Sequence, residues 1–215
     1  MEKDLSNYRK SYNKGELLLD NVPDNPIELF KNWFTEVDTH FNVGEANAMT
    51  ISTLGLDGFP KNRVVLLKKY SDQGFVFYTN YNSEKGKAIT KHPNVCLSFF
   101  WHAAERQIII KGKAEKISEA QSDAYFKSRP HGSQLSAIVS HQSEVLKDRA
   151  ELETKLKVLE TKYEGKPIER PKNWGGFIVK PVALEFWQGR PNRLHDRIRY
   201  QLKHDSSWKI ERLSP

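Results

Sequence analysis

The sequence of 215 residues contains one cysteine, Cys96, and no long run of apolar residues. A single cysteine excludes an internal disulfide and a cysteine-based zinc site. No apolar run approaches the length of a membrane-spanning helix, and the first ten residues, MEKDLSNYRK, lack the apolar core of a signal peptide. These absences predict a cytoplasmic protein that does not act in a membrane.

Sequence motifs of several common catalytic sites are also missing. The chain has no G-x-G-x-x-G and no G-x-x-x-x-G-K-[ST], so neither a Rossmann nor a P-loop nucleotide site has support. It has no G-x-S-x-G nucleophile elbow of a serine hydrolase. Its seven histidines form no H-x-x-x-H pair with a carboxylate partner. We therefore predict no metal site.

What the chain does contain is enough apolar and aromatic material for a core. The hydrophobic fraction is 38%, with 5 Trp, 8 Tyr and 11 Phe, which argues against wholesale disorder. The net charge of +7 predicts an affinity for anions, and nucleic acids, nucleotides and small phosphates all qualify. Residues 1–24 are polar and basic, and we predict a flexible arm there, followed by a single domain over residues 25–215.

The patterns along residues 25–215 predict many strands and a few clustered helices. Asn25 can cap a first helix with Pro26 at its first position, and the apolar residues Ile27, Phe30, Phe34, Val37 and Phe41 follow the helical period. Strand signals cover residues 48–55, 63–70, 74–80, 94–101, 106–117, 175–181, 183–189, 193–202 and 208–213. Short turns between most strands favour a closed or nearly closed antiparallel barrel, mainly β with packed helices.

The remaining helical signals lie at residues 83–93 and within a helical insert at residues 118–165. Ser118 and Gln121 form a capping box for the first helix of the insert. A longer helix is predicted from Ser143 to Tyr163, with a stripe at Leu152, Leu156, Leu159 and Tyr163. We expect that stripe to pack on the barrel or on a partner subunit.

A run of basic residues near the C-terminus, EFWQGRPNRLHDRIRYQL (residues 185–202), suggests chemistry. If the run is a strand, Arg193, His195, Arg197 and Arg199 project from one face. Cations placed so closely repel one another unless anions face them. The alternative is a solvated sheet edge, where charge discourages association between strands.

A second group of residues could bind a phosphate. Tyr125, Arg129 and Ser133 follow one another at fourfold spacing, and Pro130 is expected to break the helix and leave them around a turn. Their side chains are suitable hydrogen-bond donors for a phosphate. A solvated helix end explains this segment equally well.

Several blocks together resemble one known family. EFWQGRPNRLHDR (residues 185–197) is similar to the C-terminal signature of the pyridoxine/pyridoxamine 5′-phosphate oxidases. RVVLLK, FYTN, ERQ, YFKSRP, SHQS, WGGF and WKIERLSP resemble the family's other blocks in the same order, from about Tyr8 to Pro215. The resemblance implies an FMN-binding split β-barrel that works as a homodimer with FMN in the subunit interface.

By this resemblance, the chain oxidises pyridoxine 5′-phosphate or pyridoxamine 5′-phosphate to pyridoxal 5′-phosphate, and O₂ accepts the electrons to give H₂O₂. The implied FMN-binding residues are Arg63, Val64, Val65, Leu66, Leu67, Lys68, Tyr78, Thr79, Lys85, Gln107, Gln142, Ser143, Trp187 and Arg197. The implied substrate-binding residues are Arg9, Lys10, Ser11, Tyr12, Lys68, Tyr125, Arg129, Ser133, Arg193, Leu194 and His195. Arg193 and His195, which would face the pyridine ring, are the implied catalytic residues.

One position departs from the family pattern. The family usually reads Ser-Arg-Lys where this chain has Ser83, Glu84 and Lys85. A carboxylate in place of a cation should weaken FMN binding unless Glu84 points away.

Two other classes of protein remain as alternatives. Another split-barrel enzyme could use a flavin or a deazaflavin with a different reductant, although the full substrate-phosphate set argues against this. A basic nucleic-acid binder is disfavoured because acids are interleaved with the basic residues and no nucleic-acid module is recognisable.

Overall fold

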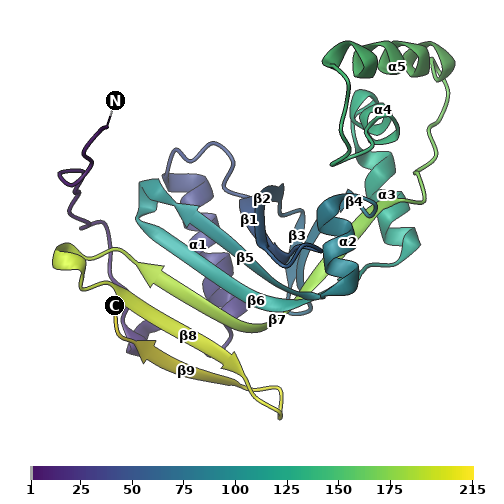
Figure 1. The fold of residues 1–215 in the computed structure, drawn as a ribbon. Coiled ribbons are helices and arrows are strands. Elements are labelled where there is room, and N and C mark those ends of the chain that lie inside the picture. Colours follow the sequence, from purple (N-terminus) through teal and green to yellow (C-terminus); the bar gives the residue numbers. More distant parts are fainter. Residues whose placement is uncertain (1) are drawn as a thin grey trace. The chain divides into compact units, whose positions relative to one another are not determined.

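The structure is a computed structural model that describes residues 2–215, and nine strands of one sheet lie within them (Figure 1). The strands are β1 (Ala48–Leu54), β2 (Pro60–Leu66), β3 (Lys69–Ser71), β4 (Gly74–Asn80), β5 (Asn94–Trp101), β6 (Arg106–Lys116), β7 (Trp174–Gln188), β8 (Asp196–Leu202) and β9 (Trp208–Leu213). Hydrogen-bonded neighbours follow the order β2-β1-β5-β6-β7-β4-β3, and β8 pairs with both β7 and β9. The pairs β3–β4, β4–β7, β7–β8 and β8–β9 are antiparallel, as predicted.

Two of the helices begin at the caps that the sequence predicts, Asn25 for the first and Ser118 for the third. The helices are α1 (Pro26–His40), α2 (Glu84–Lys91), α3 (Glu119–Ser128), α4 (His131–Val139) and α5 (Arg149–Lys162), with 3-10 turns η1 (Leu19–Asn21), η2 (His102–Ala104) and η3 (Pro191–Arg193). The Asn25 side chain accepts from the N–H of Ile27, and Ser118 and Gln121 form the predicted capping box. These local bonds satisfy backbone donors that a helix start leaves free.

The chain divides into two compact units. Unit 1 runs up to Thr50 and also contains Leu97–Lys111 and Pro181–Pro215. Unit 2 contains Ile51–Cys96 and Gly112–Lys180. The strands β1, β5, β6 and β7 therefore contribute residues to both units.

The core of unit 1 is built on α1. Phe30 is fully buried, and its ring lies 5.3 Å from that of Phe99. Trp33 meets Phe186 edge to face at 5.3 Å. These contacts follow from the helical period of the apolar residues, which brings Phe30 and Trp33 to one face of the helix.

The core of unit 2 supports the segment that joins α3, α4 and α5. Phe126, Leu135, Ile168 and Trp174 form a buried cluster. Leu156, Leu159 and Tyr163 pack against it, so most of the predicted stripe on the long helix covers a core of its own unit.

Several strand predictions are wrong in their extent. The strand predicted for residues 63–70 is interrupted, because β2 ends at Leu66 and β3 begins at Lys69. Between them Leu67 turns into the core, where it is 4% exposed, and the N–H of Lys68 donates to the carbonyl of Val76 on β4. Arg63 and Lys68 thus do not share one strand.

The strands predicted for residues 175–181 and 183–189 are instead one continuous strand, β7. Pro181, where the two predictions meet, lies between two registers, because β7 pairs with β4 as far as Val179 and with β8 from Ala183. Pro181 thus falls outside the registers of β7 with β4 and with β8, where a proline is tolerated because it has no N–H to donate.

The strand that carries the C-terminal basic run begins only at Asp196, so Arg193 and His195 precede it. The predicted common strand face of Arg193, His195, Arg197 and Arg199 is therefore wrong. The cause lies in the backbone, because Arg193 has a φ of 61°, in the left-handed region that a strand does not adopt.

The helix predicted to start at Ser143 starts instead at Arg149, with Asp148 as its cap. The Asp148 carboxylate accepts from the N–H of Glu151 at 2.9 Å. Ser143 has a φ of 76°, which a helix start cannot accommodate. Ser143 therefore belongs to the loop before α5.

Within residues 2–215, no helix is long and apolar enough to cross a membrane. The same residues contain no group of three or more His, Cys, Asp or Glu side chains arranged to hold a metal ion.

Candidate functional site

Unit 2 contains a cavity of about 500 Å³, formed by β2, the end of β4, α2, α3, α4 and the start of β7. The predicted site residues that line it are Val64, Val65, Leu66, Lys68, Tyr78, Thr79, Lys85, Tyr125, Arg129, Ser133 and Gln142. Pro130, the residue of the predicted turn, also lines it, together with Asn80, Ser136, Ala137, Ser140 and Trp174, which were not predicted as site residues. Asn80 and Trp174 could have been predicted, because they lie in the FYTN and WGGF blocks that resemble the family.

Lys85 is the buried cation of this cavity. It is 7% exposed, and its Nζ donates to Thr79 Oγ1 at 3.2 Å and to Gln142 Oε1 at 3.1 Å. Thr79 in turn donates to Gln142 Oε1 at 3.0 Å. Burial, with a smaller contribution from the charge of Arg63, lowers the pKa of Lys85 to about 8. Both of these hydrogen-bond partners are neutral, so the ammonium can still take an anion as partner.

Arg129 supplies a second cation to the same cavity. It follows the last residue of α3, and Pro130 precedes α4, so the predicted turn is confirmed and Tyr125, Arg129 and Ser133 all line the cavity. Burial lowers the pKa of the guanidinium. Its Nη1 is buried and has no hydrogen-bond partner within residues 2–215. An orphaned buried donor is rare in proteins, and a bound anion would satisfy it.

A stack of aromatic rings holds this turn in place. The rings of Tyr78 and Tyr125 are 3.8 Å apart and nearly parallel, and Trp174 lies 5.5 Å from Tyr78. The Arg129 guanidinium lies over the Trp174 ring at 4.7 Å, a cation–π arrangement. These contacts pack strand β4, helix α3 and strand β7 against one another beside Arg129.

Arg63 lies outside the lining of this cavity, beside Glu84. Arg63 Nη2 is 3.4 Å from Glu84 Oε2, and Glu84 Oε1 also pairs with Lys61. The backbone N–H of Glu84 donates to Ser143 Oγ at 3.3 Å. Lys61, Glu84 and Ser143 line a second cavity of about 300 Å³. Glu84 therefore does not point away from the predicted cofactor-binding residues Arg63 and Ser143.

Unit 1 brings three other predicted site residues together. Trp187 lies 4.6 Å from His195 and 5.8 Å from Tyr12, measured between ring centres, and Tyr12 lies 5.9 Å from His195. Gly189 makes room for this cluster, because a Cβ there would come within 2.7 Å of Tyr12 Cδ2. A substitution at Gly189 would thus displace Tyr12.

The protonation state of His195 follows from its neighbours. The backbone N–H of Arg190 donates to His195 Nδ1 at 3.1 Å, so Nδ1 must be the unprotonated nitrogen. Burial, with a smaller contribution from Arg193, lowers the pKa of His195 below its ordinary value. At neutral pH the ring is therefore uncharged and has its proton on Nε2, where it can donate a hydrogen bond.

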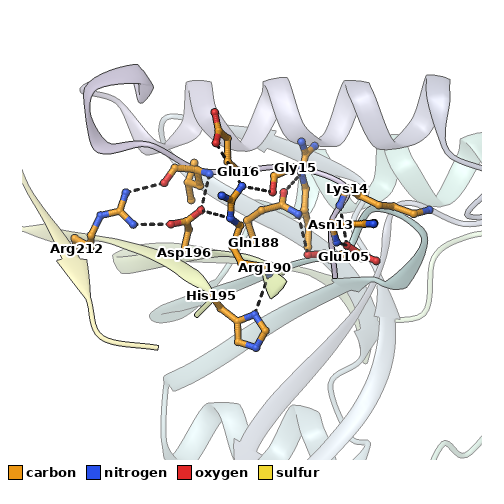
Figure 2. A network of polar contacts seen from close by, with 12 residues as sticks. Asn13, Lys14, Gly15, Glu16, Glu105, Gln188, Arg190, His195, Asp196 and Arg212 are labelled. Carbon is orange, nitrogen blue, oxygen red and sulfur yellow. Dashed lines mark hydrogen bonds and ion pairs between the residues drawn. The ribbon is translucent and has the colours of Figure 1, made fainter. Parts of the chain in front are cut away.

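Carboxylates of unit 1 hold the segment from Asn13 to Leu17 by hydrogen bonds to its backbone (Figure 2). Glu105 is 2% exposed and accepts the N–H groups of Asn13 at 2.8 Å and Lys14 at 3.0 Å. Asp196 accepts the N–H of Leu17 at 3.0 Å and an N–H of Arg212 at 2.7 Å. The chain from Asn13 to Leu17 is therefore held by buried or half-buried acids, directly after Tyr12.

The other predicted residues of unit 1 have individual positions. Arg197 on β8 donates from Nε to Glu185 at 2.8 Å, and Arg199 donates to Glu211 at 2.7 Å, so acids face both strand arginines. Gln107 is half-buried on β6. Arg9, Lys10, Ser11, Arg193 and Leu194 are exposed. Their assigned roles stay predictions.

The sheet order defines a split-barrel fold, and one of its cavities is lined by the cationic side chains Lys68, Lys85 and Arg129. Residues 36–163 match the sequence model of the family Pyridoxamine 5′-phosphate oxidase, and residues 174–215 match that of the Pyridoxine 5′-phosphate oxidase C-terminal dimerisation region. The chain belongs to the pyridoxamine 5′-phosphate oxidase family. The predicted family and its FMN-binding split-barrel fold are confirmed.

Similar proteins cover nearly the whole chain. The pyridoxine/pyridoxamine 5′-phosphate oxidase of Flavobacterium johnsoniae is 69% identical over 211 residues, which are 98% of this chain and 99% of that one. The protein of the same name from Thermosynechococcus vestitus is 48% identical over 211 residues, again 98% of this chain and 99% of that one. The crystal structure of PhzG from Burkholderia lata, in complex with tetrahydrophenazine-1-carboxylic acid, is 30% identical, covers 94% of this chain and 100% of its own, and has a TM-score of 0.87.

Proposed function

We propose that this protein is an FMN-dependent oxidase that converts pyridoxine 5′-phosphate or pyridoxamine 5′-phosphate to pyridoxal 5′-phosphate. O₂ accepts the two electrons and leaves as H₂O₂, and the amine substrate also consumes water and releases ammonia. FMN supplies the electron chemistry when it is bound, and the protein positions the reactants and tunes the site. The membership in the family and the high identity to enzymes named for this reaction support the proposal.

The observation that carries the proposal is the state of two cations, Lys85 and Arg129, among the three that line one cavity. Lys85 has neutral partners, and Arg129 has a buried nitrogen without a hydrogen-bond partner in the described chain. Two phosphates, one on the cofactor and one on the substrate, would satisfy both. The residues present therefore fit the cofactor, with Lys85, Arg63, Gln142 and Ser143 holding its phosphate and ribityl chain.

We assign the substrate phosphate to Lys68, Tyr125, Arg129 and Ser133, and the substrate ring to Arg193 and His195. The planar fork of an arginine fixes the orientation of its partner. His195, with its proton on Nε2, would donate a hydrogen bond to the substrate rather than remove a proton with that nitrogen.

The test is an oxidase assay with the FMN-loaded protein under air. Pyridoxine phosphate and pyridoxamine phosphate should each yield pyridoxal phosphate and H₂O₂ in equal amounts, with ammonia from the amine alone. Pyridoxine without its phosphate is the matched control and should react far more slowly. Protein that retains FMN but makes no peroxide from either phosphate would overturn the proposal.

The second candidate is a split-barrel flavin or deazaflavin enzyme that takes electrons from a different reductant. The Burkholderia lata relative was solved with a tricyclic carboxylic acid. The four residues assigned to the substrate phosphate favour a phosphate ester instead, since three of them, Tyr125, Arg129 and Ser133, converge from two helices on the one cavity that Lys68 also lines.

The assembly and location belong to the same proposal. A homodimer is supported by the match of residues 174–215 to a dimerisation region. We also propose a cytoplasmic location, no nucleic-acid partner, and a single domain over residues 25–215 after an N-terminal arm, since β1, β6 and β7 run through both units.

Lys85 predicts how FMN affinity depends on pH. Its pKa is about 8 in the protein without cofactor, and a bound phosphate dianion should raise it. Above pH 8 binding therefore requires uptake of a proton, and the affinity should fall by roughly tenfold between pH 7 and pH 9. Fluorescence titrations of apoprotein with FMN measure this, and the phosphate itself stays dianionic over that range.

The control for this prediction is Lys85→Met, which should bind FMN more weakly at pH 7 and should lose the pH dependence. Arg63 and Glu84 are the charged groups that act on Lys85, and neither changes its charge between pH 7 and pH 9. An affinity of the unmodified protein that stays constant from pH 7 to pH 9 would contradict the role of Lys85.

A further inference from the structure

Glu84 is a carboxylate among residues assigned to a phosphate, and Lys61 is the cation that pairs with it. Lys61 extends from β2, and Glu84 is the first residue of α2. Lys61 Nζ contacts Glu84 Oε1 and also lies 2.7 Å from Asp57 Oδ2. The side chains of Lys61 and Glu84 are 30% and 39% exposed, so this pair is partly screened by water.

Arg63 competes for the same carboxylate from the other side. Its Nη2 is 3.4 Å from Glu84 Oε2, whereas its Nη1 is held by Thr53 Oγ1 at 2.5 Å and by the carbonyl of Lys61 at 3.2 Å. Arg63 is the more buried of the two cations, with 19% of its side chain exposed. The longer contact indicates that the carboxylate is held chiefly by Lys61.

The net charge of the side chains around Glu84 depends on Lys61. Lys61, Arg63 and Lys85 contribute three positive charges, and Asp57 and Glu84 contribute two negative ones. Without Lys61 the group would be neutral, and Glu84 would have Arg63 as its remaining ion-pair partner. A guanidinium that is engaged by a carboxylate in its own chain is less available to a phosphate.

We propose that Lys61 is a positioning residue of the cofactor site, which holds the Glu84 carboxylate and so leaves Arg63 available for the phosphate of FMN. The inference rests on the proposed function for the identity of the anion. In this role Lys61 acts through Glu84 and not on the phosphate directly.

The experiment is a double-mutant cycle on FMN binding by apoprotein. Lys61→Met should raise the Kd for FMN roughly fivefold, because Glu84 then pairs with Arg63. Glu84→Gln should leave the Kd unchanged or lower it, and Lys61→Met combined with Glu84→Gln should return it close to that of the unmodified protein. Lys61→Arg should preserve the affinity, since arginine can make the same ion pair.

Two controls separate this role from general charge and from folding. Lys87 lines the same cavity of about 300 Å³, so Lys87→Met removes an equal charge and should change the Kd less. Riboflavin, which lacks the phosphate, should bind the Lys61→Met variant and the unmodified protein equally. Thermal melting shows whether each variant is folded.

The outcomes distinguish the two proposals. If unmodified apoprotein does not bind FMN, both the proposed function and this inference fail. If it binds FMN but Lys61→Met weakens binding equally with and without Glu84→Gln, Lys61 acts on the phosphate directly and this inference alone fails. An unchanged Kd in Lys61→Met also overturns it.

Discussion

Replacing Arg193 with alanine should slow flavin reduction by the substrate at least roughly a hundredfold while the protein still folds, dimerises and retains FMN. Arg193 is exposed and has a left-handed φ of 61°, so its side chain contributes little packing to unit 1. Residues in such backbone conformations occur often at functional sites. The proposed role is to hold the substrate ring, and small errors in placing a reacting atom cost large rate factors.

Anaerobic stopped-flow measurement of flavin bleaching by pyridoxine phosphate reports this step directly. Arg193→Lys is the matched control, because it keeps the charge and loses the planar fork, and it should recover only part of the rate. The melting temperature and the FMN content of both variants should match those of the unmodified protein. An unchanged reduction rate in Arg193→Ala would mean that Arg193 is a solvated surface residue.

Replacing Arg129 with alanine should weaken the binding of pyridoxine phosphate about thirtyfold and leave FMN bound. The buried Nη1 of Arg129 has no partner in the described chain, so a substrate phosphate would gain a charge-assisted hydrogen bond in a desolvated place. Such a bond contributes about 2 kcal/mol, which corresponds to this factor in the dissociation constant. Because the donor is orphaned without substrate, its loss removes no hydrogen bond from the free protein, which loses the cation–π contact with Trp174.

The measurement is the Michaelis constant for pyridoxine phosphate beside that for unphosphorylated pyridoxine. The variant should show a higher Michaelis constant for pyridoxine phosphate and an unchanged Michaelis constant for unphosphorylated pyridoxine. The FMN affinity of the apoprotein serves as the second readout, since Lys85 and its partners remain intact. A variant that releases FMN while its KM for pyridoxine phosphate stays constant would show that Arg129 holds the cofactor instead.

The local parts of the fold could be predicted from the sequence because local bonds decide them. The caps at Asn25 and Ser118 and the turn at Pro130 depend on residues a few positions apart. The turn at Pro130 also made part of the candidate site predictable, since the residues on either side of it line one cavity.

Two of the errors arose where distant segments decide the local conformation. The end of β2 depends on the burial of Leu67 and on a hydrogen bond from Lys68 to β4. The continuity of β7 through Pro181 depends on two different partner strands. Periodicity along a single segment contains no information about either.

The same limit applies to the site. The sequence suggested Arg129 as a phosphate ligand, but its position over Trp174 depends on a strand far along the chain. The ion pair of Lys61 on β2 with Glu84 on α2 likewise could not be predicted, since no sequence motif contains both residues. Contacts of this kind decide which cations remain available to a ligand.

The attachment of Asn13 and Lys14 to Glu105 has a consequence for the kinetics of the N-terminal arm. Tyr12 directly precedes this anchor. The effective concentration of the Tyr12 ring near His195 is therefore set by the one peptide bond that joins it to the anchored Asn13. The contact of Tyr12 with His195 is therefore intramolecular and does not change with enzyme dilution. It also requires little loop-closure entropy, since Tyr12 is bonded directly to the anchored Asn13.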